Sequence, residues 1–361
     1  MGRPWRLVGR PGALALALLG AWMLWSLVSA VRGEAGWRPV LPWVLCPLVL
    51  VAGAAGGAAL RRRARSPAVP VALALTSTSL VLGALLVVDS GKAPLGYPNA
   101  NAALAVQLVA LSGLVLLAAP AEAARGRLLL VASAVAAGLA VGLNRSAAGV
   151  AVLLAVGIVV VLMVWRRPVS RAWRVAAVAL GAVASAVAAG LIVVAAREPV
   201  FPQWARTAFD PAREQLWQDA VSLWQQRPLT GSGPGSFARA TTLAADADTV
   251  AAHSSVLQVG AETGWVGVGF LALTGLAGLL WTARGRTPEA VVGAAGWTAL
   301  LVHSTADHLV EFGPVVLLAG AVVGWAGTSG LETSDPGASR RGGGDRSEEL
   351  DVAERERPLP G

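Results

Sequence analysis

The chain has 361 residues, of which 55% are hydrophobic and only 14% are charged, whereas ordinary soluble domains carry roughly 25% charged residues. Its apolar residues lie in blocks of about 20, the length that a helix needs to cross about 30 Å of hydrocarbon. Neither an amphipathic-helix period nor strand alternation runs through these blocks, which excludes a water-soluble fold. The sequence predicts an all-α polytopic membrane protein.

The net charge of +8 is carried by Arg residues that lie in short runs between the apolar blocks. Such runs set the orientation of a membrane protein, so we expect no nucleic-acid partner. Cys46 is the only cysteine of the chain, and this excludes an intramolecular disulfide.

The first apolar run, 13–31, follows a basic N-terminus. A signal peptide has a similar pattern, and Ser29-Ala30-Val31 resembles a cleavage site. The run is long for a signal peptide and further spans follow it, so we expect a retained first helix. Nine more spans are expected, at 40–60, 69–88, 102–119, 128–143, 147–165, 173–196, 256–281, 288–305 and 311–327.

Most of the 29 Lys and Arg residues lie on one side of this ten-span arrangement. The positive-inside rule then places both termini in the cytoplasm and the large loop 197–255, which precedes the last three spans, outside. We treat 1–327 as one transmembrane domain. We expect 328–361 to be a disordered cytoplasmic tail, because its Gly, Ser, Pro and charged residues bury too little apolar surface to fold. No pair of interrupted half-helices is visible in the spans.

Two short polar segments fall on the predicted outer side. In 97–101 (YPNAN) the proline disfavours helix at the residue before it, and Asn99 or Asn101 is suited to cap the helix that follows; both are also candidates for substrate binding. In 143–146 (LNRS) the connection is so tight that Arg145 lies at the membrane boundary. A charge there either snorkels to the interface or faces a wet cavity, and we favour an anion binder that faces a cavity.

The large loop begins with a predicted amphipathic helix, for which Asp210 is suited to be the N-cap. Arg213 stands near its N-terminus, and both helix N-termini and Arg forks suit phosphate oxygens. The apolar residues at helical spacing are Leu216, Ala220, Leu223 and Trp224.

A glycine-rich turn follows in 226–237 (QRPLTGSGPGSF). Gly231 and Gly233 indicate positive φ or close approach of the backbone, as in loops that cradle phosphate. A sharp connection between helices needs the same residues, and the turn lacks the Lys-Ser/Thr of a nucleotide P-loop.

His253 and Glu262 lie where the loop enters the next span. A neutral imidazole at this boundary can take a proton from a hydroxyl group, although a structural histidine is the alternative. Glu262 lies nine residues further into the span, where a carboxylate is costly unless it faces the interior. We therefore consider it a candidate for substrate binding.

The order and spacing of these motifs resemble the O-antigen ligase/polymerase superfamily of bacterial membrane proteins, from about residue 70 to 325. The residues that carry the resemblance are Pro98-Asn99, Asn144-Arg145-Ser146, Arg213-x-x-x-Trp217, Pro228-Leu229-x-Gly231-x-Gly233-x-x-x-Phe237, His253-Ser254-x-x-Leu257-Gln258 and Glu262-x-Gly264-x-x-Gly267.

The resemblance implies a glycosyltransferase of the bacterial cytoplasmic membrane that needs no metal or other cofactor. Its donor would be an undecaprenyl-pyrophosphate-linked glycan, and its acceptor a glycan, a lipid or a protein. Arg145 and Arg213 match the arginines that engage the donor pyrophosphate, and His253 matches the histidine that activates the acceptor hydroxyl. Polymerase and ligase remain open, and this chain is short for the family, with a compact outer loop.

Two acidic groups suggest metal binding as an alternative. Asp246-Ala247-Asp248 has the form of a DxD motif, but acids in an Ala- and Thr-rich loop are usually solvated. His303, Asp307 and Glu311 would share one face of a continuous helix, as metal ligation requires, although the Gly-Pro pair after them indicates that the helix stops nearby. We favour a hydrogen-bonded cluster that shapes the substrate cavity through Asp307.

A transporter or flippase of a lipid-linked saccharide is the alternative function. Such a protein needs access from both faces and polar residues in the middle of several spans. Here the mid-span positions are mostly Ala, Val, Leu and Gly, and the polar groups gather on the outer side. This pattern favours chemistry on one face of the membrane.

Overall fold

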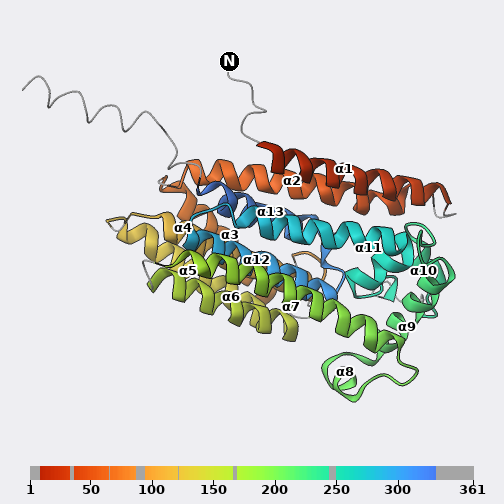
Figure 1. Ribbon diagram of the computed structural model, residues 1–361. Helices are drawn as coiled ribbons and strands as arrows, with labels where there is room; N and C mark the ends of the chain where they lie inside the picture. Colours follow the sequence, from red (N-terminus) through yellow and green to blue (C-terminus); the bar gives the residue numbers. More distant parts are fainter. Residues whose placement is uncertain are drawn as a thin grey trace, which may run out of the picture.

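A computed structural model describes residues 9–32, 36–64, 66–86, 94–120, 122–165, 169–243 and 249–330. Every regular element in these ranges is a helix (Figure 1), which confirms the predicted all-α polytopic fold. The start of the basic N-terminus, the acidic pair at 246–248 and the segment 331–361 of the predicted tail lie outside the described residues.

Ten long helices correspond one to one with the predicted spans. They are α1 (Gly9–Arg32), α2 (Leu41–Arg62), α3 (Ala68–Leu86), α4 (Pro98–Ala118), α5 (Ala124–Leu143), α6 (Ala147–Trp165), α7 (Arg171–Arg197), α11 (Ser255–Thr282), α12 (Thr287–Thr305) and α13 (Gly313–Thr328). Among the described residues, the eight from α1 to α7 and α11 are long and apolar enough to cross a membrane. The helix α13 is apolar but has only 16 residues. The chain is a multi-pass membrane protein.

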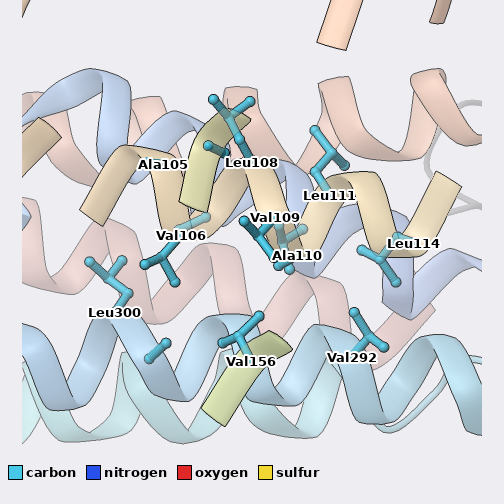
Figure 2. Packing of buried hydrophobic residues seen from close by; sticks show 14 of the residues in the cluster. Ala105, Val106, Leu108, Val109, Ala110, Leu111, Leu114, Val156, Val292 and Leu300 are labelled. Carbon is cyan, nitrogen blue, oxygen red and sulfur yellow. The ribbon is translucent and has the colours of Figure 1, made fainter. Parts of the chain in front are cut away.

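The helix α4 forms the centre of the bundle. In its most apolar stretch 94% of the residues are buried, against at most 33% in the other candidate spans. A helix that is apolar all round is suited to this position. Figure 2 shows its side chains beside Val156 of α6 and beside Val292 and Leu300 of α12. The N-terminal end of α4, which begins at Pro98, is thereby attached to a rigid core.

The helices α2 and α13 approach until their backbones touch. A Cβ atom added to Gly57 would lie 2.0 Å from the carbonyl oxygen of Ala321, and one added to Gly324 would lie 1.9 Å from that of Ala54. Gly53 and Gly320 make the same kind of contact one turn away. Small residues four positions apart are the usual means of close helix packing in a membrane.

Replacing Gly57 by alanine should therefore destabilise the bundle by about 1–3 kcal/mol, the usual cost of overpacking. The neighbouring Gly56 is the matched control, because a Cβ atom there meets nothing within 4 Å. Thermal unfolding of the detergent-solubilised protein should show a lower midpoint for Gly57→Ala and an unchanged one for Gly56→Ala. Equal midpoints for the two variants would contradict the backbone contact.

The helix α11 is interrupted at Gly264, where φ is 69° and ψ is −168°. Sequence analysis did not predict this break. A break inside a helix frees backbone groups that need other partners, and five of the freed groups are bonded to other segments. The carbonyls of Ala261, Glu262 and Thr263 accept from Ser232 N (3.0 Å), Gly233 N (2.8 Å) and Trp25 Nε1 (3.0 Å), and the amides of Trp265 and Val266 donate to Pro228 O (2.8 Å) and Leu229 O (3.4 Å).

The segment between α7 and α11 folds over one end of the bundle, which we call the loop end (Figure 1). It contains α8 (Gln203–Ala208), α9 (Pro211–Gln226) and α10 (Ser236–Ala240). The predicted cap of α9 is confirmed, since Asp210 Oδ1 accepts from the amide of Ala212 at 2.8 Å. A second apolar core holds this segment on α7 and α11, with Trp217 and Phe237 fully buried.

Candidate functional site

The carboxylate of Asp307 is the centre of a polar cluster at the loop end. Asp307 lies between the end of α12 and the short 3-10 helix η4 (Leu309–Glu311), and it is only 1% exposed. Because α12 ends at Thr305, His303 and Asp307 do not share the face of a continuous helix. After the end of α12, Asp307 lies against the N-terminal ends of α4, α9 and α11.

Four residues from these segments and the neighbouring His308 surround Asp307, and we call them together with it the Asp307 cluster. Their contacts with its carboxylate are Tyr97 Oη at 2.9 and 2.8 Å, Asn99 Nδ2 at 2.5 Å, Arg213 Nη2 at 3.2 Å, His253 Nδ1 at 3.4 Å, His308 Nδ1 at 3.0 Å and the His308 amide at 2.8 Å. A buried carboxylate is stable only when it is paired and hydrogen-bonded in this way.

The sequence before each long helix explains how these side chains meet. Tyr97 has an extended backbone before Pro98, which starts α4, as the residue before a proline prefers. His253 has a φ of 47° and directly precedes Ser254, the N-cap of α11. The first turn of α11 is tied to the cluster, because the Asp307 carbonyl accepts from the amide (2.9 Å) and hydroxyl (3.0 Å) of Ser255.

The imidazole of His253 is oriented by Tyr97 and Asp307. Its Nδ1 lies 3.0 Å from the Tyr97 hydroxyl and 3.4 Å from the Asp307 carboxylate, and the residue is 8% exposed. A carboxylate beside Nδ1 favours the tautomer that carries its proton there, so Nε2 bears the lone pair. This is the arrangement of a histidine that accepts a proton.

The cluster keeps Asp307 ionised at neutral pH. Burial alone would raise the pKa of Asp307, but hydrogen bonds from His253 and His308 and the charge of Arg213 outweigh it and hold the pKa well below its usual value. Burial and the charge of Asp307 raise the pKa of Tyr97, so its hydroxyl remains a donor. The site therefore holds a fixed negative charge against which a cationic imidazole is stable.

Arg213 connects the first turn of α9 to the cluster. Its Nη1 donates to the carbonyl of Ala306 and its Nη2 to Asp307, and its side chain is 15% exposed. A guanidinium has five N–H donors, so donors remain for an anionic ligand.

Arg145 lies at the same end of the bundle but outside the Asp307 cluster. It has a φ of 53° and an exposed side chain between α5 and α6, and no acid pairs with it in the described part of the chain. Its neighbour Asn144 accepts from Asn101 Nδ2 at 3.0 Å. Asn101 Oδ1 also accepts from the amide of Leu95 at 3.0 Å, so Asn101 holds the turn before α4. Neither Asn101 nor Asn99 caps α4, and that prediction is wrong.

Gly231, Gly233 and Glu262, which were predicted to bind substrate, make hydrogen bonds within the chain. The amides of the glycine turn donate to the chain itself: that of Gly231 to Arg227 O, and that of Gly233 to Glu262 O. Glu262 is 2% exposed, and its carboxylate accepts from Trp43 Nε1 at 3.1 Å and Gln258 Nε2 at 2.8 Å. These groups hold the glycine turn against the break in α11, so the amides of Gly231 and Gly233 are not available to cradle a phosphate.

A set of potential metal ligands exists within the cluster, although its members differ from the predicted His303, Asp307 and Glu311. One ligand atom each of His253, Asp307 and His308 lies within 4.8 Å of the other two. Imidazole and carboxylate suit several divalent transition metals, but a cation there would compete with Arg213 for Asp307.

An apolar cavity adjoins the cluster through Glu311. Its walls come from α1, α2, α11, α12 and α13, and they include Leu19, Trp22, Trp43, Leu271 and Leu301. These residues lie in the half of the bundle towards the loop end. The polar cluster and the apolar cavity thus lie next to each other.

Sequence reasoning missed Tyr97 and His308 as members of the site. Tyr97 is the only tyrosine of the chain, and all three histidines lie in the part of the sequence from the end of the large loop onward. The scarcity of these residue types in so apolar a chain was the available signal.

Residues 132–272 match the O-antigen ligase family. This match confirms the resemblance to the O-antigen ligase/polymerase-like family for that part of the chain. The match includes Arg145, Arg213 and His253, and it ends before Asp307. No curated protein matches the chain. The matched family acts in polysaccharide biosynthesis, as the sequence analysis predicted.

Proposed function

We propose that this O-antigen ligase-like protein is an inverting glycosyltransferase that transfers or polymerises a glycan from an undecaprenyl-pyrophosphate donor. The observation that carries the proposal is the Asp307 cluster, in which one buried carboxylate orients His253 and pairs with Arg213. In the proposal, His253 is the proton acceptor and Arg213 the cationic donor group.

In the proposed reaction, the acceptor hydroxyl attacks the anomeric carbon of the donor glycan. The new C–O bond forms as the bond from that carbon to the pyrophosphate oxygen breaks. The hydroxyl proton passes to Nε2 of His253, and the resulting imidazolium is stabilised by Asp307. Polyprenyl pyrophosphate leaves with the electron pair and one additional negative charge.

Arginines stabilise this developing charge, which is the step on which a pyrophosphate leaving group depends. Arg213 offers its remaining N–H donors from the first turn of α9, whose N-terminus also favours an anion. Arg145 is the second proposed pyrophosphate ligand, reaching the donor from the connection between α5 and α6. Asn99 is proposed to line the substrate site beside Tyr97.

The lipid part of the donor is proposed to occupy the apolar cavity beside Glu311. Its aliphatic and aromatic walls lie at membrane depth, where a polyprenyl chain has no cost of transfer from the bilayer. The positive-inside rule places the loop end on the outer face of the cytoplasmic membrane, with both termini inside. The acceptor is a glycan, a lipid or a protein.

Reconstituted turnover tests this function. The purified protein in vesicles is given polyprenyl-pyrophosphate-linked glycan isolated from its host, and transferred glycan is measured by mass spectrometry. Arg213→Ala is expected to lower turnover by at least about 10²-fold, as for loss of one donor to a developing anion. Arg213→Lys should recover little, because a point charge lacks the bidentate fork.

Arg206→Ala is the matched control, since Arg206 is an exposed arginine of the same loop that pairs with Glu214 at 3.5 Å. It should retain turnover close to that of the wild type. Unchanged turnover in Arg213→Ala would refute the proposed role of Arg213. Movement of intact donor across the vesicle without bond cleavage would identify a flippase, and loss of turnover with a chelator would indicate a metal at His253, Asp307 and His308.

A further inference from the structure

A second hollow at the loop end is separate from the Asp307 cluster. Its lining residues are Arg197, Val221, Trp224, Gln225, Pro228 and Trp265. These residues come from the end of α7, the last turns of α9, the start of the glycine turn and the break in α11. We call it the Trp224–Trp265 pocket.

Two tryptophan rings form a fixed corner in this pocket. Their centroids are 4.5 Å apart and their planes meet at 51°. Trp224 is 3% exposed, donates its Nε1–H to Pro228 O at 3.1 Å and packs on Gly260, where a Cβ atom would come within 2.4 Å of the ring. Trp265 is held by its amide, which donates to the same Pro228 carbonyl, yet its side chain is 46% exposed. The pocket thus combines an anchored wall with an accessible aromatic face.

The polar groups of the pocket suit hydroxyl groups. Gln225 and Arg197 are both exposed, and Arg197 forms no ion pair with any residue that the structure describes. An amide both donates and accepts hydrogen bonds, and a guanidinium donates. A sugar hydroxyl can use both kinds of group, whereas a phosphate, which only accepts, leaves the Gln225 carbonyl oxygen without a partner.

The aromatic face supplies the other half of such a site. The C–H groups on one side of a pyranose ring pack on the electron-rich face of an indole, because that face carries the negative end of the ring quadrupole. An aromatic surface with a few polar groups at its rim is the usual form of a small-molecule site.

The helix α9 connects this pocket to the reacting centre. Arg213 lies in its first turn and Trp224 in its last turns, and a rise of 1.5 Å per residue separates them by about 16 Å. A glycan held at the Asp307 cluster and extended along α9 therefore reaches the pocket, whereas a single sugar does not.

We propose that the Trp224–Trp265 pocket binds a sugar residue of the glycan several units away from the reacting end. This inference rests on the proposed function. The pocket would hold a long glycan in place and so make transfer depend on the length of the chain.

Direct binding tests the pocket without any transfer reaction. The purified wild-type protein is applied to an array of bacterial polysaccharide fragments that range from single sugars to long oligomers. Wild type should retain oligomers, Trp265→Ala should bind them about tenfold more weakly, a loss of ~1.4 kcal/mol, and Trp265→Phe should keep part of the affinity. Trp204→Ala is the matched control, because Trp204 of α8 is 47% exposed and does not line the pocket.

Transfer kinetics supply the second readout. With host-derived donors of graded length, Trp265→Ala and Arg197→Gln should raise KM for long glycans by roughly tenfold with little change in kcat, and leave single-repeat donors unaffected.

Equal effects on short and long donors would overturn the pocket's role while leaving the transferase intact. Failure of the wild type to transfer would refute the proposed function alone, since the array still reports binding. The inference would be overturned if Trp265→Ala bound the oligomers on the array as tightly as the wild type. It would also be overturned if native mass spectra showed that Arg197→Gln loses a bound anionic lipid.

Discussion

Asp307→Asn is expected to lower glycan transfer by about 10³-fold or more, the scale known for loss of the carboxylate that orients a catalytic histidine. The amide keeps the size of the side chain but removes the charge that pairs with Arg213 and stabilises the cation of His253. The Asn side chain also has an N–H group where Tyr97 and Arg213 need a hydrogen-bond acceptor. Turnover with reconstituted donor and acceptor measures the effect.

The matched control for this variant is Asp219→Asn in α9. Asp219 is also an acceptor of several hydrogen bonds, from Gln215, Thr241 and Thr242, but it lies outside the Asp307 cluster. It should keep transfer within about threefold of the wild type, because it lies away from the reacting centre. Because Asp307 also ties α11 to the α12–α13 connection, the melting temperature of each variant is measured. A folded Asp307→Asn protein with wild-type turnover would refute the central role of this carboxylate.

His253→Gly is expected to lower transfer by about 10²–10⁴-fold, the range for loss of a general base. Glycine accepts the φ of 47° at this position without strain, so the backbone before α11 should stay in place. Added imidazole should restore part of the turnover, since it can occupy the space of the missing ring beside Asp307. The rate is measured with and without imidazole across its titration range.

Two companion variants make the His253 result specific. Asparagine also tolerates a positive φ, so the His253→Asn protein should fold. It should be inactive and insensitive to imidazole, because the Asn side chain occupies the space that added imidazole would need. His308 contacts Asp307 from another side. The His308→Gln variant should lose less activity than either His253 variant. Full activity in His253→Gly without imidazole would exclude His253 as the base.

Much of the candidate site could be predicted from local sequence. Arg213 and His253 stood out because charged and titratable residues are scarce in this chain, and the N-cap at Asp210 follows from side-chain chemistry that acts within a few residues. Asp307 was found as a polar residue near the end of a span. Its partners were not predictable, because Tyr97 and Arg213 are brought to it by packing between segments far apart in the chain.

The glycine turn shows the opposite case. Gly231 and Gly233 were correctly identified as positions of positive φ or close approach, but the sequence could not tell whether a ligand or the protein itself approaches. The answer depended on the break at Gly264, which no apolar pattern reveals. The amides of the turn satisfy carbonyls that this break leaves open in α11.

The sequence by itself determined the ten long helices, because the length and polarity of each block decide whether it can lie in hydrocarbon. It also determined which end of the bundle collects the polar residues. Only the tertiary structure decided which of those residues meet. The Asp307 cluster exists because the ends of α4, α9, α11 and α12 converge over one buried carboxylate, and such convergence is set by packing between helices rather than by any local pattern.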